Sequence, residues 1–156
     1  MPGFPNPVNE TSARVVAGGV VAMSAATVAA DQPWLLVPLT YGFAARVLAG
    51  PAYSPLGLLA TRVVTPRLKL RHRYSPGPPK RLAQGIGLLV TATSSYLVLT
   101  GRRRAAYRVL SLVIGAAGLE MCLGLCLGCK LFGLGMRVGL VPASTCRACE
   151  DIWARY

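Results

Sequence analysis

The residues best suited to chemistry are five cysteines, all within the last 35 residues of this 156-residue chain. Four of them form two C-x-x-C pairs, Cys126 with Cys129 and Cys146 with Cys149, while Cys122 stands apart. Two thiols at this spacing can close a disulfide, and one thiolate can attack a partner's disulfide while the other resolves the mixed disulfide. The first interpretation is therefore a redox dithiol formed by Cys126 and Cys129.

The two pairs together also fit a metal site. Sixteen residues separate them, which lies within the spacing of four-cysteine zinc sites. A zinc ion held by Cys126, Cys129, Cys146 and Cys149 would tie the C-terminal tail to the preceding helix, and an iron–sulfur cluster uses the same ligands. The third interpretation is structural, because Cys122, Cys126 and Cys129 would share one face of a continuous helix and could pack there. All three interpretations stay open, and so does the question of whether the protein is an enzyme.

Glu120 is the other candidate for chemistry, because it lies inside a long apolar run. An ionisable side chain in such a run is costly and marks a functional site by default; the alternative is a structural ion pair between helices, or a protonated carboxyl bonded to Ser or Thr. Its predicted partner is Arg46, near the end of the second apolar run. Glu120 also supports another hypothesis, an oligomeric transporter for an ion or a small sulfur species.

The composition indicates which kind of structural element positions these residues. Hydrophobic residues make up 53 % and charged residues 14 % of the chain, about half the usual share of charge for a soluble domain. Four apolar runs predict transmembrane helices over about 15–31, 33–50, 82–100 and 107–132. The predicted fold is all-α, a four-helix transmembrane domain (14–136) in contact with the lipid bilayer, between a polar arm (1–13) and a cysteine-containing tail (137–156).

The long connection between the second and third runs, residues 50–81, is basic. Its first part, residues 55–64, predicts a short amphipathic helix lying in the membrane interface. Its last part, residues 74–81, contains three prolines and is predicted to be extended. Within the third run, the hydroxyl side chains of residues 91–95 are expected to bond to backbone carbonyls or to other helices.

The distribution of charge predicts the orientation. The net charge is +12, and with the N-terminus inside, 13 of the 17 Lys and Arg residues fall on the cytoplasmic side. Both termini are therefore predicted to be cytoplasmic, in the cell (plasma) membrane. The cluster Arg102–Arg104 is the exception, because this topology places it outside. Nucleic acid is not an expected partner, because no aromatic-rich platform accompanies the basic residues.

Three segments resemble the DUF4395 family, a bacterial family of integral membrane proteins and a domain of unknown function. They are residues 50–57 (GPAYSPLG), residues 78–85 (PPKRLAQG) and residues 126–130 (CLGCK). The resemblance extends from about Asn9 to the C-terminus, and the second cysteine pair looks like a feature of an actinobacterial subset. It implies a four-helix membrane protein that works with a thioredoxin-like or sulfurtransferase partner, and hence thiol or sulfur chemistry at Cys126 and Cys129.

Overall fold

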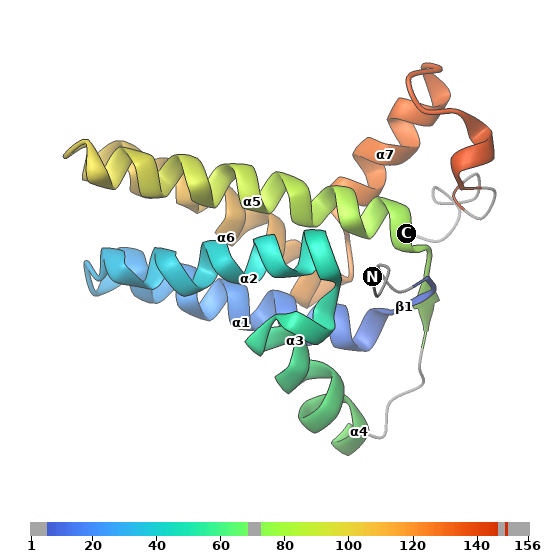
Figure 1. Ribbon diagram of the computed structural model, residues 1–156, viewed down its shortest axis with the longest axis horizontal. Helices are drawn as coiled ribbons and strands as arrows, with labels where there is room; N and C mark the ends of the chain where they lie inside the picture. Colours follow the sequence, from blue (N-terminus) through green and yellow to red (C-terminus); the bar gives the residue numbers. More distant parts are fainter. Residues whose placement is uncertain (1–5, 69–72, 147–148, 150–156) are drawn as a thin grey trace.

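The computed structural model describes residues 6–68, 73–146 and 149, and most of them are helical. Four long helices run side by side (Figure 1): α1 (Glu10–Ala29), α2 (Leu36–Ala49), α5 (Gly77–Leu99) and α6 (Arg103–Leu123). The most extensive packing is of α1 against α6, α6 against α5, and α5 against α2. In the described part of the chain the only strands are β1 (Val8–Asn9) and β2 (Tyr74–Ser75), which form one short antiparallel pair. The predicted all-α class is confirmed.

Three of these helices, α1, α5 and α6, are long and apolar enough to cross a membrane. The fourth, α2, continues from the 3-10 turn η1 (Pro33–Leu35), and together they form a shorter apolar helix. Large apolar side chains point outward, with Leu99 86 % and Leu112 65 % exposed. Polar side chains are buried between the helices, among them Ser24, Thr91 and Ser94. An apolar core including Leu36, Leu39 and Leu110 is buried as well. Exposed apolar side chains together with buried small polar ones suit helices that pack in lipid.

The polar centre of α5 behaves as the sequence predicts. The hydroxyls of Thr91, Thr93, Ser94 and Ser95 each donate to the carbonyl four residues earlier in the helix, at 2.8–2.9 Å. Their hydrogen bonds are therefore satisfied within the helix. Nearby, Gly87 lets α5 approach α2 closely, because a Cβ there would lie 2.3 Å from the Phe43 ring.

The start of α5 differs from the prediction that residues 74–81 are extended. The helix begins at Gly77, and Pro78 and Pro79 occupy its first turn. Proline is tolerated there because the first backbone N–H groups of a helix have no partner within it. The earlier start places Lys80 and Gln84 one helical turn apart on the same helix, although the sequence predicts Lys80 in an extended segment.

The predicted helix over 107–132 is wrong in one respect, because it is two helices. Helix α6 ends at Leu123 and Gly124 follows in the left-handed region, with φ 70°, a conformation that favours glycine. The guanidinium of Arg14 donates to the carbonyls of Met121 and Cys122, at 3.1 and 2.8 Å. These bonds satisfy carbonyls that the end of α6 would leave without partners.

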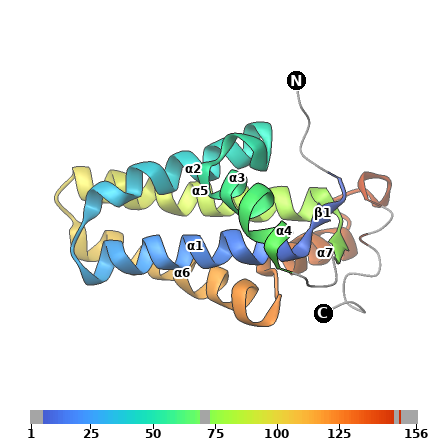
Figure 2. The ribbon, with the colours of Figure 1, turned by 90° about the horizontal axis from the view of Figure 1, so that it is seen from below.

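After this break the chain turns into α7 (Leu127–Arg137), which packs against α5 (Figure 2). Gly128 permits that contact, since a Cβ there would lie 2.4 Å from the Cβ of Ala83. The change of direction also removes the predicted shared helical face of Cys122, Cys126 and Cys129. Cys122 is in α6, whereas Cys126 and Cys129 belong to the start of α7.

The connection between α2 and α5 is largely helical. It contains the 3-10 turn η2 (Pro51–Tyr53), α3 (Pro55–Leu58), the π-helical segment η3 (Leu59–Val64) and α4 (Thr65–Arg67). A helical segment therefore occupies the predicted residues 55–64, and its position in a membrane interface stays a prediction. The predicted arm 1–13 is shorter, because α1 begins at Glu10 with Asn9 as its N-cap. Of the predicted tail, the structure describes residues through 146, including the 3-10 turn η4 (Ala143–Thr145), and Cys149.

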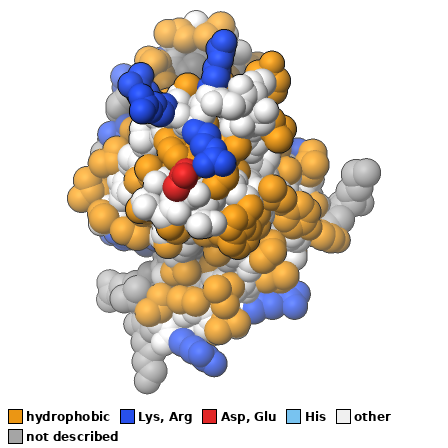
Figure 3. Space-filling model, turned by 90° about the vertical axis from the view of Figure 1, so that its left-hand side faces the viewer, with side chains coloured by type: hydrophobic (Ala, Val, Ile, Leu, Met, Phe, Trp, Pro, Cys, Tyr) orange, Lys and Arg blue, Asp and Glu red, His pale blue; other side chains and the backbone are white. Residues whose placement is uncertain are grey.

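The two ends of the bundle differ. One end carries the strand pair, α3, α4 and α7 (Figure 1), and the other carries only the turns that join α1 to α2 and α5 to α6. Figure 3 looks onto this second end, where basic and acidic side chains stand among apolar ones. Here Asp31 accepts a bond from Arg103 at 3.1 Å and another from the Tyr107 hydroxyl. Part of the Arg102–Arg104 cluster thus has an anionic partner.

Candidate functional site

A buried ion pair joins the two central helices at the end that carries α7. The Lys80 ammonium on α5 lies 2.5 Å from a carboxylate oxygen of Glu120 on α6, and the two side chains are 4 % and 14 % exposed. Glu120 is therefore paired, as the sequence suggests, but the predicted partner Arg46 is wrong. Glu120 also lies near the end of α6, three residues before its last residue, because the helix stops at Leu123.

The first cysteine pair begins α7 directly beside this ion pair. Cys126 is the N-cap residue, and its sulfur accepts a hydrogen bond from the backbone N–H of Cys129 at 3.3 Å. Both are free thiols in the structure, and they are only 2 % and 1 % exposed. A sulfur in the N-cap position faces the positive end of the helix dipole, which favours a thiolate.

The pKa values of the two thiols shift in opposite directions. A hydrogen bond between the two thiols lowers the pKa of Cys126, and the Lys80 ammonium and the Cys129 backbone N–H lower it further against the effects of burial and Glu120. The same thiol–thiol hydrogen bond, together with burial, raises the pKa of the Cys129 thiol. Cys126 is therefore the member of the pair that ionises first, and Cys129 keeps its proton.

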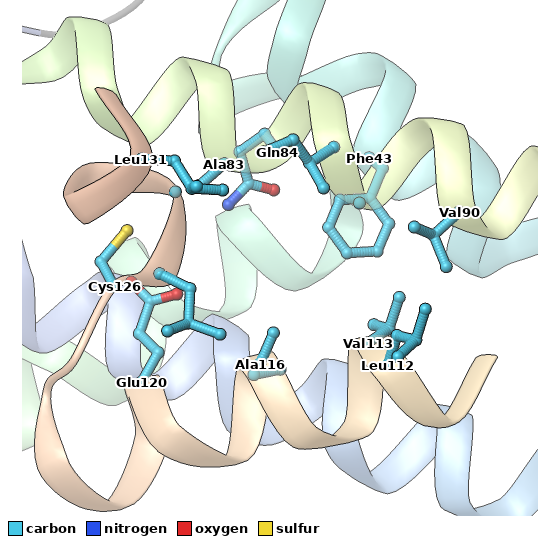
Figure 4. Close-up of a pocket in the computed structure, with 15 residues that line it drawn as sticks. Phe43, Ala83, Gln84, Val90, Leu112, Val113, Ala116, Glu120, Cys126 and Leu131 are labelled. Carbon is cyan, nitrogen blue, oxygen red and sulfur yellow. The ribbon is translucent and has the colours of Figure 1, made fainter. Parts of the chain in front are cut away.

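Cys126 and Glu120 line one end of a cavity of about 300 Å³ between α5, α6 and α7 (Figure 4). The rest of its wall is apolar and includes Phe43, Val90 and Leu112. Gln84 adds an amide group near the cysteine end. The thiol therefore faces a pocket of small-molecule size, even though almost none of it is exposed on the protein surface.

Arg46, the predicted partner of Glu120, lies on the other side of Gln84. Its Nε donates to the Gln84 side-chain oxygen at 2.7 Å, and its Nη1 donates to the Ser54 hydroxyl at 2.9 Å. The guanidinium also stacks over the Phe43 ring, 4.6 Å from its centroid. Arg46 is 3 % exposed, and no carboxylate of the described residues forms an ion pair with it.

The remaining cysteines are not gathered around the first pair. Cys146 and Cys149 form a disulfide that packs against Phe132 of α7, and Cys122 is an exposed free thiol. Within residues 6–68, 73–146 and 149, no three His, Cys, Asp or Glu side chains lie close enough together to hold a metal ion. Zinc or iron–sulfur binding by the four cysteines stays a prediction, as does transport through Glu120.

Sequence reasoning missed Lys80 and Gln84 as members of the site. The sequence predicts an extended segment at Lys80 and places Gln84 near the start of the helix predicted over 82–100, with no role for either. The signal that could have found them is the Pro78–Pro79 pair, because proline is favoured in the first turn of a helix. A helix that starts there puts Lys80, Gln84 and Gly87 on one face, at spacings of four and three.

The model of a family described as a domain of unknown function (DUF4395) matches residues 8–137. The chain belongs to this family. The match ends at the last residue of α7, so it covers the Cys126–Cys129 pair but not Cys146 and Cys149. The chain matches no curated protein and no solved structure.

We expect Lys80→Gln to raise the pH at which Cys126 ionises, because the variant removes the cation that favours the thiolate. Ultraviolet absorbance of the thiolate, followed against pH in a protein with Cys122, Cys146 and Cys149 replaced by Ser, measures this. Arg81→Gln is the matched control, since it removes an equal charge one residue further on, where the side chain donates to the Val47 carbonyl. Equal titrations in both variants would contradict the role given to Lys80.

Proposed function

We propose that this protein is a membrane thiol protein, in which the Cys126–Cys129 pair passes reducing equivalents or sulfur to and from a partner. The observation that carries this proposal is the position of Cys126. Cys126 is the N-cap residue of α7, its sulfur accepts a hydrogen bond from the Cys129 N–H, and the buried ammonium of Lys80 lies nearby. Each of these favours a thiolate, and the thiolate is the reactive form of cysteine.

The second thiol completes the chemistry. The Cys126 thiolate attacks a disulfide of a thioredoxin-like protein, so that one partner thiolate leaves and a mixed disulfide forms. Cys129 then loses its proton and attacks the Cys126 sulfur, which releases the second partner thiolate. Two electrons reach the partner, and the pair is left as a disulfide. With a sulfurtransferase, Cys126 instead attacks the outer sulfur of the donor's persulfide, accepts that sulfur and releases the donor thiolate.

A protein partner needs access to the buried sulfur of Cys126, and this access requires α7 to move. Cys126 is 2 % exposed, so a protein partner reaches it only when α7 moves away from α5. The chain before α7 suits such a movement, because Gly124 and Leu125 form no helix and separate it from α6. A small disulfide or polysulfide could instead enter through the cavity that Cys126 lines.

Trapping tests the thiol proposal. We expect Cys129→Ser to accumulate a mixed disulfide at Cys126 with a thioredoxin-like or sulfurtransferase protein, because the resolving thiol is gone. Mass spectrometry of the adduct from membranes, after alkylation of free thiols, identifies the cysteine and the protein. Cys126→Ser is the matched control and should yield no adduct. Equal adducts in the two variants, or none in either, would count against a reacting pair.

We also propose that all four long helices span the cell membrane, with both chain ends in the cytoplasm. The support is the 13-to-4 division of Lys and Arg and the outward apolar side chains of the long helices. This topology puts the thiol pair, the ion pair and α7 at the cytoplasmic end. It implies a reducing environment, in which Cys126 and Cys129 rest as thiols and the Cys146–Cys149 disulfide at the same end is expected to open.

Labelling of single cysteines tests this topology. In a cysteine-free protein, we expect an impermeant thiol reagent to label Thr100→Cys in intact cells, because residue 100 lies at the external turn. It should label Ser144→Cys only after lysis, because residue 144 lies at the α7 end. Both positions are exposed, so burial does not distort the comparison. The opposite pattern would invert the topology.

A further inference from the structure

A second cavity lies on the opposite side of Gln84 from the thiol pair. Its volume is about 280 Å³, and residues from β1, α1, α2, η3, β2 and α5 line it. Two cationic side chains, Arg46 and Lys80, contribute to its wall, and no acidic side chain does. Glu120 lines the first cavity and not this one. The second cavity is therefore positively charged inside.

Arg46 carries the strongest indication of a ligand. Its Nε and Nη1 have partners, but its buried Nη2 has no hydrogen-bond partner among the described residues. A buried, unpaired N–H of a charged group is costly, and native structures nearly always provide it with an acceptor. The residue is 3 % exposed and lines the cavity. Nη2 itself is closed to water-sized atoms in this conformation, so an acceptor in the cavity would meet this need after the guanidinium turns toward it.

The balance of buried charges also supports an anionic ligand. Arg46 and Lys80 bring two positive charges, while Glu120 supplies one negative charge and is bonded to Lys80. One buried cation is thus left without a carboxylate contact. A guanidinium and an ammonium that line the same cavity are groups that proteins use for oxyanions. Further hydrogen-bonding side chains around the cavity are Asn9, Ser12, Thr61 and Tyr74.

We propose that this second cavity binds a tetrahedral oxyanion of the sulfate or phosphate type, held by Arg46 and Lys80. The oxyanion is either a free ion or the headgroup of an anionic lipid, since both present the same chemistry. This site is separate from the thiol pair, and its binding is measured in a Cys126→Ser, Cys129→Ser protein. Failure of the thiol proposal therefore leaves this test unaffected.

The first arm of the experiment measures free ions. Thermal unfolding of the purified protein in neutral detergent is followed against sulfate, thiosulfate and phosphate at constant ionic strength. We expect saturable stabilisation, with affinity reduced about tenfold or more in Arg46→Gln, because a charged hydrogen-bonding group is lost. Arg81→Gln, with the same change in net charge at an exposed side chain that does not line this cavity, should stay within about twofold of the unchanged protein, as exposed charges are screened by salt.

The second arm measures lipid. Native mass spectrometry compares retention of phosphatidylglycerol with that of phosphatidylcholine in the same variants. Preferential retention of the anionic lipid that is lost in Arg46→Gln, without any effect of free ions, assigns the site to a headgroup. The reverse result assigns it to a free ion.

A third variant covers the case in which Arg46→Gln does not fold. Ala13→Leu keeps every charge and fills part of the cavity, because Ala13 lines it. It should weaken binding as Arg46→Gln does. The proposal is overturned if the protein binds neither free oxyanion nor anionic lipid, or if binding is equal in Ala13→Leu, Arg81→Gln and the unchanged protein.

Discussion

The contact between Lys80 and Glu120 is the constraint on which the rest of this end of the molecule depends. Both groups are largely buried, and a buried charge is tolerated only with a partner. The pair therefore fixes the register of α5 against α6 where the two helices meet α7. It also holds the ammonium beside Cys126 and Cys129, and beside the second cavity. One lysine thus influences both the thiols and the carboxylate.

The ends of the helices make this arrangement possible. Two prolines start α5 early enough to include Lys80, and Gly124 stops α6 three residues after Glu120. The guanidinium of Arg14 then caps the free carbonyls of α6, which lets the chain turn back and place Cys126 at the N-cap of α7. If α6 continued without this break, the cysteine pair would extend away from the bundle instead of packing against α5.

The sequence was sufficient for the features that depend on composition and local pattern. Apolar runs located the long helices and the all-α class, and Glu120 stood out as an ionisable residue in an apolar run. Hydroxyl groups in α5 bond to carbonyls as expected. The partner of Glu120 and the end of α6 could not be read in this way, because they depend on helix boundaries and on contacts distant in sequence. Arg46 and Lys80 are both near helix ends, and only the packing of α5 on α6 selects Lys80.

A double-mutant cycle on the stability of the protein tests the central claim most directly. Thermal or denaturant unfolding would be measured for Lys80→Met, Glu120→Gln and the double variant. The account predicts that each single variant loses about 3–5 kcal/mol, because it leaves a buried charge or polar group without its partner. The double variant should lose clearly less than the sum of the two. Additive losses would contradict the account, because they would show that Lys80 and Glu120 contribute independently.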